Sequence, residues 1–158
     1  MKLSILIPSL ESRADQLKSL CTDIHMQANQ LGLQLGKEYE ICVFVDNKEK
    51  TVGFKRNYLL DQAKGEYTVF IDDDDRISSE YLKLVMQAII ENPGVDVIGI
   101  KGRFYDKGEF KKEFIHSTQY GAYTENDEFY FRPPNHLNPM KASISKQYKF
   151  IDEGDKSP

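Results

Sequence analysis

The first half of the chain alternates short apolar runs with stretches in which apolar residues recur every three or four positions. The apolar runs at residues 2–7, 39–45 and 66–71 predict three buried strands, the first ending at Pro8. Helical spacing follows the first run, from a capping-box pattern at residues 12–15 to Gly32. Helical spacing also follows the second run, and extends from Gly53 to Gly65. This alternation predicts an α/β fold, in which helices sandwich a mainly parallel sheet.

The second half begins with the same alternation and then loses it. A third helix is predicted after Ser78 or Ser79, closed by residues 92–94, and a fourth strand at residues 95–100. Residues 102–105 and 109–114 then predict a small hairpin around a turn at 106–108. Beyond residue 115 the chain is polar and rich in tyrosine, and a short helix is predicted at 141–148.

Composition places the chain among ordinary globular proteins. Its 158 residues are 40% hydrophobic and 29% charged, which fits one domain, and the net charge of −4 argues against broad binding to nucleic acid or an anionic membrane. Cys21 and Cys42 are expected to be small buried apolar residues in a reducing environment. No signal-peptide pattern precedes the first strand, and no apolar stretch approaches the roughly 20 residues that span a bilayer, so a cytoplasmic location is expected.

Four consecutive aspartates, Asp72 to Asp75, follow the third predicted strand directly. Ser9 and Asp46 follow the first two strands, and ligands of open parallel sheets bind where the carboxyl ends of strands meet. Carboxylates crowded together repel one another, and a hard divalent cation such as Mg²⁺ or Mn²⁺ would compensate them. The alternative is a solvated acidic turn that caps the next helix, the role expected of Asp75.

These segments together resemble the family 2 glycosyltransferases of the GT-A fold. The central match is Gly53-Phe54-Lys55-Arg56-Asn57, then residues 63–67, then Phe70-Ile71-Asp72-Asp73-Asp74-Asp75. Residues 4–9 resemble the first strand of the family, and residues 135–141 are similar to a segment on the acceptor side. The resemblance covers about residues 3–150 and implies one GT-A-like domain over 1–158. Residues 1–100 would bind the donor, and 101–158 would form the acceptor side.

The resemblance implies a metal-dependent transfer of sugar from a nucleotide-sugar donor, expected to be UDP-linked, to an acceptor hydroxyl with inversion. The acceptor class stays open among glycans, lipid-linked molecules, proteins and nucleic acids. The family's Asp-x-Asp motif maps onto Asp72-Asp73-Asp74. Asp74 and Asp72 are then expected to hold Mn²⁺ or Mg²⁺, and Asp72 or Asp73 to face the ribose. The register Asp73-Asp74-Asp75 also fits.

Other site residues follow from the same resemblance, and each has a structural alternative. Asp46 is expected to bind the nucleoside base, with an Asx turn as the alternative. Ser9, Glu11 and Arg13 are expected to line the base and ribose, unless they only start a helix. Arg56, next to Lys55, is expected near the diphosphate, with a solvated helix face as the alternative for both residues.

The acceptor side is less strongly patterned. His136 and Lys141 are expected there, and a backbone-bonded loop histidine is the alternative for His136. Five cations surround the predicted hairpin and are interpreted first as a solvated surface, with contact to an anionic acceptor such as nucleic acid as the alternative: Lys101, Arg103, Lys107, Lys111 and Lys112.

The general base of an inverting transferase is the part of the pattern that this chain lacks. The family places an acidic pair some way past a phenylalanine like Phe150, and the nearest counterpart here is Asp155. A truncated chain, a minimal enzyme and a donor-binding domain without chemistry therefore stay open. A Mg²⁺-dependent phosphohydrolase or nucleotidyltransferase is a further alternative for an acidic strand end.

Overall fold

The computed structural model describes residues 1–154, and its centre is a four-stranded sheet. β1 (Leu3–Leu10), β2 (Tyr39–Asp46) and β3 (Tyr67–Phe70) are parallel, and β8 (Met140–Lys141) adds an antiparallel edge in the order β2-β1-β3-β8. The predicted α/β class with a mainly parallel sheet is therefore confirmed.

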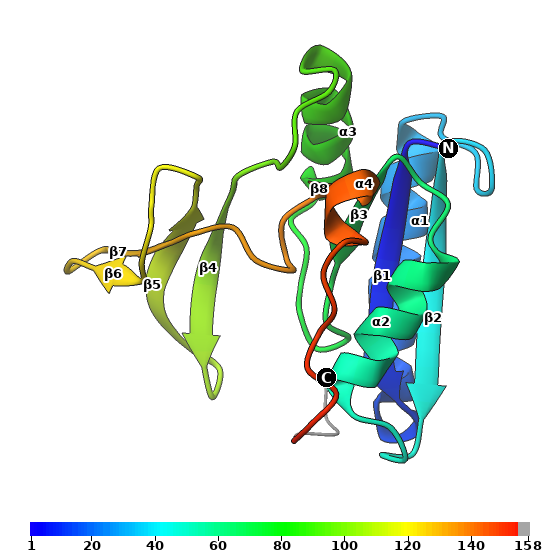
Figure 1. Cartoon of the computed structure of the whole chain (residues 1–158), viewed down its shortest axis with the longest axis horizontal. Coiled ribbons are helices and arrows are strands. Elements are labelled where there is room, and N and C mark those ends of the chain that lie inside the picture. The colour runs from blue at the N-terminus through cyan, green and yellow to red at the C-terminus, as the bar shows by residue number, and fades with distance from the viewer. Residues whose placement is uncertain (155–158) are drawn as a thin grey trace.

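Helices cover both faces of this sheet, as the alternation predicted. α1 (Ala14–Gln30) and α3 (Tyr81–Glu91) pack on one face, and α2 (Val52–Gln62) lies on the other (Figure 1). Side chains of β1 alternate between the two cores: Leu3, Ile5 and Ile7 meet α1 and α3, whereas Leu6 meets α2. All eight β1 residues are buried, as expected for a central strand.

β1 continues past the proline that was predicted to end it. The Leu6 carbonyl accepts from Ile71 N–H, so the backbone of Leu6 faces the β3 side of the strand. The backbone of Pro8, two residues on, faces that side as well. The ladder with β3 ends at Leu6 and Phe70, and Pro8 therefore interrupts no bond between these strands. The strand runs on to Leu10, opposite Asp46.

Four other local predictions were wrong. Residues 95–100 make only one bridge to the main sheet, Val97 with Met140, and β8 takes the place of the predicted strand. The predicted capping box is a 3-10 turn, η1 (Glu11–Arg13), with no side-chain cap on α1. α4 (Ala142–Ser145) is shorter than predicted, and β2 is an edge strand with exposed Val43 and Val45 rather than a buried one.

The amino end of α3 is capped from another helix rather than by the predicted serines. Gln27 of α1 accepts from Leu82 N–H at 2.9 Å and donates to the Ser78 carbonyl at 2.9 Å. The residue at the cap position, Glu80, makes no side-chain cap bond. The segment after the aspartates is thus held by α1.

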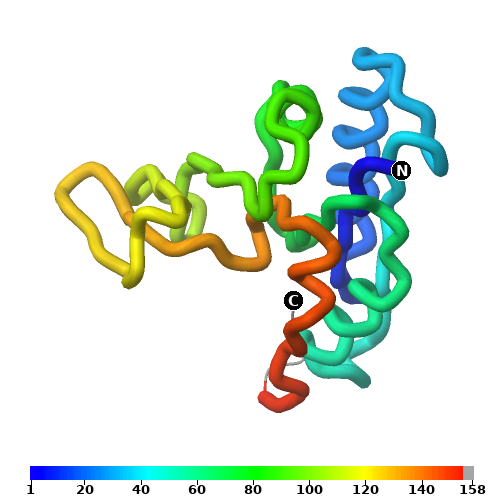
Figure 2. Tube along the Cα trace, turned by 45° about the horizontal axis from the view of Figure 1, so that its top comes forward, coloured from blue at the N-terminus to red at the C-terminus, as the bar shows by residue number. Residues whose placement is uncertain are grey.

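Residues 100–132 form a second sheet that extends away from the body, here called the hairpin arm (Figure 2). β4 (Ile100–Asp106) and β5 (Glu109–His116) make the predicted hairpin, and β7 (Phe129–Arg132) and β6 (Thr124–Glu125) complete the order β4-β5-β7-β6. Buried His116 and Asn138, joined at 2.9 Å, tie the arm to the body.

Two further expectations concern the cysteines and the membrane. Cys21 and Cys42 are free thiols and only partly buried. Within residues 1–154, none of the helices combines the length and apolar character needed to cross a membrane.

Candidate functional site

The carboxyl ends of β1, β2 and β3 meet at one edge of the sheet, as predicted. Leu10 and Asp46 are opposed at the ends of β1 and β2, and the aspartates follow Ile71 on the other side of β1. Their charges are met by cations from η1 and α2. The site therefore combines four carboxylates with nearby guanidinium groups.

Asp73 is turned into the protein rather than toward the opening. Its side chain is fully buried, accepts from Ser9 Oγ at 2.7 Å and accepts from Arg13 Nη1 at 2.8 Å. These bonds tie the third strand end to the loop that follows β1. Both carboxylate oxygens of Asp73 are engaged in fixing the loop that carries Arg13.

Arg13 lies between two of the aspartates. The same Nη1 atom is 3.1 Å from Oδ2 of Asp74, whose side chain is about half exposed (52%). The hydrogen bond to Asp73 raises the pKa of Arg13, against the opposing effect of partial burial. The chain thus places its own cation beside Asp74, the carboxylate expected to bind a metal.

Asp72 faces α2 and the loop before β8. Arg56 Nη2 donates to Asp72 Oδ1 at 3.0 Å and lies 3.1 Å from His136 Nε2. Burial alone would raise the pKa of Asp72, but the neighbouring His136 and the charge of Arg56 outweigh it, so the pKa is lowered. Asp72 therefore stays ionised, and its main partner is a guanidinium.

Asp74 and Asp75 carry the most exposed carboxylates of the four aspartates. Desolvation by the surrounding protein, followed by the charges of Asp72 and Asp74, raises the pKa of Asp75 to about 6. Within residues 1–154, no group of three or more acidic, histidine or cysteine side chains is placed to hold a metal. Mg²⁺ commonly uses one or two carboxylates together with phosphate oxygens, a mode that does not need three protein ligands.

Asp46 is paired with Lys55, a residue for which a solvated helix face was the alternative. Lys55 is fully buried, and its ammonium lies 2.5 Å from Asp46 Oδ1, so that alternative is wrong. Asp46 also accepts from the backbone N–H groups of Lys48 and Lys50, which forms the Asx-type turn foreseen as an alternative. Burial opposes the shift, but Lys55 and these bonds lower the pKa of Asp46.

The segment from Gly53 to Asn57 also holds the last described part of the chain. Asn57 donates to the Phe150 carbonyl at 3.0 Å and accepts from Phe150 N–H at 2.9 Å. A Cβ on Gly53 would lie 1.9 Å from the Ile151 carbonyl oxygen, so only glycine allows this approach. Arg56 then lies against the rings of Phe70 and Phe150, at 5.8 and 5.5 Å from their centroids.

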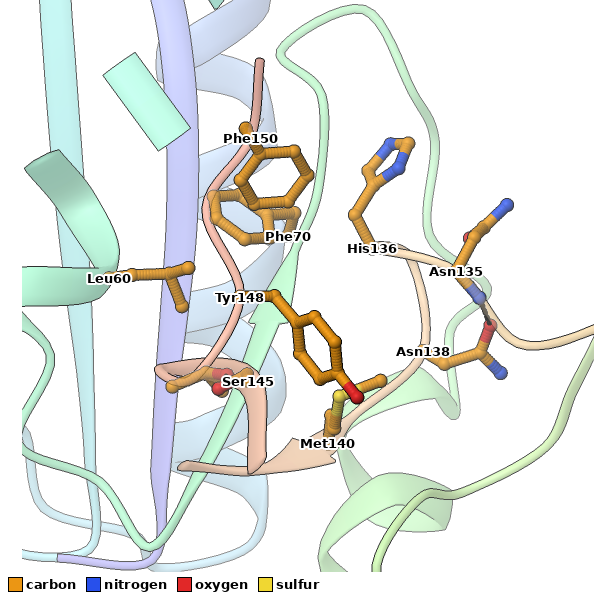
Figure 3. Close-up of a pocket in the computed structure, with 10 residues that line it drawn as sticks. Leu60, Phe70, Asn135, His136, Asn138, Met140, Ser145, Tyr148 and Phe150 are labelled. Atoms are coloured by element: carbon orange, nitrogen blue, oxygen red, sulfur yellow. Dashed lines mark hydrogen bonds between the residues drawn. The ribbon is translucent and has the colours of Figure 1, made fainter. Parts of the chain in front are cut away.

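A pocket of about 190 Å³ opens beside this cluster (Figure 3). Phe70, His136 and Phe150 lie at one end, and Met140 and Tyr148 lie at the other. His136, from the segment expected on the acceptor side, thus contacts both the pocket and Arg56.

The remaining predicted residues lie farther out. Glu11 is exposed in η1, and its side chain makes no hydrogen bond within the part of the chain that the structure describes. Lys141 pairs with Tyr67 at the amino end of β3, the end away from the aspartates. Asp155, the candidate base, lies outside the described residues.

Sequence reasoning missed three contributors to the site. The pairing of Lys55 with Asp46 was not predicted, and Asn57 and Phe150 were not assigned to the site. The spacing of Gly53 and Asn57, one helical turn apart, was the available signal for a shared contact.

Comparison with known proteins gives matches of three kinds. The model described as "Glycosyl transferase family 2" matches residues 27–152. The chain is 32% identical over 139 residues to the poly(ribitol-phosphate) beta-glucosyltransferase of Bacillus spizizenii, an alignment that covers 71% of this chain and 22% of that protein. The crystal structure of S. aureus TarS 1–349 matches with a TM-score of 0.56 at 16% identity, covering 98% of this chain and 52% of that one. The chain thus spans about a fifth of the curated relative, and the TarS likeness concerns the fold.

Proposed function

Because the chain belongs to glycosyl transferase family 2, we propose that it binds a nucleotide-sugar at the carboxyl ends of β1, β2 and β3 and transfers the sugar to an acceptor hydroxyl. The observation that carries the proposal is the cluster of Asp72 to Asp75 with Arg13 and Arg56 at one sheet edge. A UDP-linked donor and inversion at the anomeric carbon are parts of this proposal.

Asp46 is proposed to recognise the nucleoside base. Its carboxylate has about four acceptor positions, and Lys55 and the N–H groups of Lys48 and Lys50 occupy three. One position is left for an N–H donor such as the imide of uracil. The buried ammonium keeps this carboxylate ionised and in place, so that it acts only as an acceptor.

The diphosphate is proposed to lie between Arg13 and Arg56. Both are planar cations paired with the aspartates, and a guanidinium matches phosphate oxygens with two parallel donors. Asp74 and Asp75 would hold a divalent cation, Mg²⁺ or Mn²⁺, together with the donor's phosphates. Such an ion supplies Lewis-acid stabilisation of the leaving diphosphate.

The acceptor is proposed to be a polyol phosphate polymer. The relative from Bacillus spizizenii is described as acting on poly(ribitol-phosphate), and the alignment with it extends over 71% of this chain. His136, which touches Arg56 and lines the adjacent pocket, is proposed to mark the side from which the acceptor approaches.

The reaction products separate this function from its alternatives. The chain, incubated with UDP-glucose, Mn²⁺ and poly(ribitol phosphate), is expected to release intact UDP and to add glucose to the polymer. Release of inorganic phosphate or pyrophosphate would instead indicate a phosphohydrolase or nucleotidyltransferase. Donor binding without release of UDP would indicate a donor-binding domain. A Gly121→Ala protein is a suitable control, because a Cβ at this position meets no atom within 4 Å.

A further inference from the structure

We propose that a hollow on the hairpin arm binds the acceptor, as a chain of sugar or polyol units joined by phosphodiesters. The hollow measures about 190 Å³ and is lined by Arg103, Tyr105, Phe110 and Glu113. The inference rests on the proposed function, since it presupposes an acceptor. Figure 1 shows that β4 runs toward the same end of the molecule as β2, so the turn between β4 and β5 points to the end where the aspartates lie.

A break in the β4–β5 ladder builds the hollow. Phe104 lies opposite Lys112, and an unbroken register would place Lys111 opposite Tyr105. The register shift between Phe104 and Tyr105 instead brings Phe110 opposite Tyr105. Directly opposed residues of antiparallel strands share a face, and bulges commonly redirect side chains in this way. The bulge therefore puts two aromatic rings on the face that carries Arg103.

The two rings form an exposed aromatic surface. Their centroids are 5.6 Å apart in an edge-to-face arrangement, and Tyr105 and Phe110 are 51% and 53% exposed. Flat rings that keep this much contact area open pack well against the C–H faces of sugars and polyols. A sugar or polyol unit also carries hydroxyl groups, which can donate hydrogen bonds to the carboxylate of Glu113 at the hollow.

Charge at the hollow favours an anionic ligand. Lys101 Nζ lies 2.6 Å from Glu113 Oε2, whereas Arg103 Nε is 4.0 Å from the other oxygen and its side chain is 69% exposed. Two cations thus share one carboxylate, and a guanidinium with open donors lies beside the rings. Phosphate oxygens are the natural partners of such a group. A ligand that offers both C–H faces to the rings and phosphate to the guanidinium matches poly(ribitol phosphate), the polymer named in the description of the relative.

The test measures acceptor and donor binding separately on the full chain. A ribitol-phosphate oligomer is titrated into the wild type, a Tyr105→Ala/Phe110→Ala double variant and Arg103→Gln. Both variants are expected to bind the oligomer about tenfold more weakly, because the double variant loses the packed rings and Arg103→Gln loses a charge-assisted contact. UDP affinity should be unchanged, because none of these residues contacts the aspartate cluster.

Matched controls come from the same arm. Tyr123→Ala removes an exposed ring, and Lys107→Asn removes a cation in the turn, where Asn tolerates the positive φ of 51°. Neither lines the hollow, so both should bind the oligomer within about twofold of the wild type.

Three outcomes would overturn the proposal. The first is a wild type that binds UDP but not the oligomer, which would leave the proposed donor site intact. The second is unchanged oligomer affinity in both variants. The third is a wild-type dimer, seen by sedimentation, that the double variant dissociates, since the rings would then serve a second copy. Oligomer binding without binding of any nucleotide-sugar would instead contradict the proposed function alone.

Discussion

The Lys55 ammonium lies 2.5 Å from Oδ1 of Asp46, inside the protein and at the end of β2. It also donates to the Ser9 carbonyl at 3.1 Å, so one side chain from α2 joins the ends of β1 and β2. A buried charge that loses its partner is costly, whereas the intact pair is well compensated. This contact fixes the carboxylate that is proposed to recognise the base.

Replacing Lys55 with methionine is expected to lower the free energy of unfolding by about 3 kcal/mol, because Asp46 loses its cation. Urea unfolding measures this loss. Lys64→Met, at an exposed position, is the control and should change stability by no more than about 0.5 kcal/mol. Equal stability of the two variants would contradict a structural role for the buried pair.

Gly53→Ala is expected to dislodge residues 150–152 from α2, since the added Cβ would lie 1.9 Å from the Ile151 carbonyl oxygen. The expected loss is about 2 kcal/mol of unfolding free energy, typical of overpacking. Faster backbone amide exchange at Phe150, whose N–H is held by Asn57, would report the local effect. Gly121→Ala serves as the control. Unchanged exchange at Phe150 would show that the close approach is unimportant.

Arg13→Gln is expected to tighten Mn²⁺ binding about tenfold in the absence of donor. The guanidinium lies 3.1 Å from Asp74 Oδ2 and competes with an added cation for that carboxylate. Electron paramagnetic resonance of free Mn²⁺ measures the affinity without any need for activity. Lys18→Gln, on α1, removes the same charge away from the aspartates and should leave the affinity unchanged. Weaker binding in Arg13→Gln would contradict competition at Asp74.

Asp75→Asn is expected to stabilise the protein at pH 7 but not below about pH 4. The pKa of Asp75 rises from 3.8 to about 6 on folding, so the folded state binds the proton more tightly than the unfolded state. Stability is therefore lost as pH rises through this interval, and the variant avoids that loss. Because the side chain is exposed, we expect a gain of only about 1 kcal/mol at pH 7.

Urea unfolding at pH 4 and pH 7 checks this sign. Asp23→Asn, on the exposed part of α1, is the control and should show no comparable difference between the two pH values. A stabilisation by Asp75→Asn that is equal at both pH values would contradict the raised pKa.

The sequence predicts the framework of this fold because its strands and helices are strongly periodic. β1, β2, β3 and the arm hairpin were expected, and each lies within a few residues of its predicted place. β8 was missed, because a two-residue strand leaves no periodic signal. The early end predicted for β1 follows from treating Pro8 as a stop, although the ladder beside it had already ended.

The separate roles of the aspartates could not be predicted from sequence. Four identical side chains in a row carry no information about which one faces inward. Asp73 faces inward because Ser9 and Arg13, which lie some 60 residues away in sequence, donate hydrogen bonds to it. Lys55 and Arg56 were equally indistinguishable, and the turn of α2 buries the first and leaves the second at the site.

Calorimetric titration with UDP-sugars and GDP-sugars, with and without Mn²⁺, tests the central claim most directly. The wild type is expected to bind a UDP-sugar in a Mn²⁺-dependent manner, and Asp74→Asn and Arg56→Gln are expected to weaken that binding at least about tenfold. Lys64→Met should bind as the wild type does. Failure of every donor to bind with Mn²⁺, or binding that is indifferent to both substitutions, would contradict a nucleotide-sugar site at the ends of these strands.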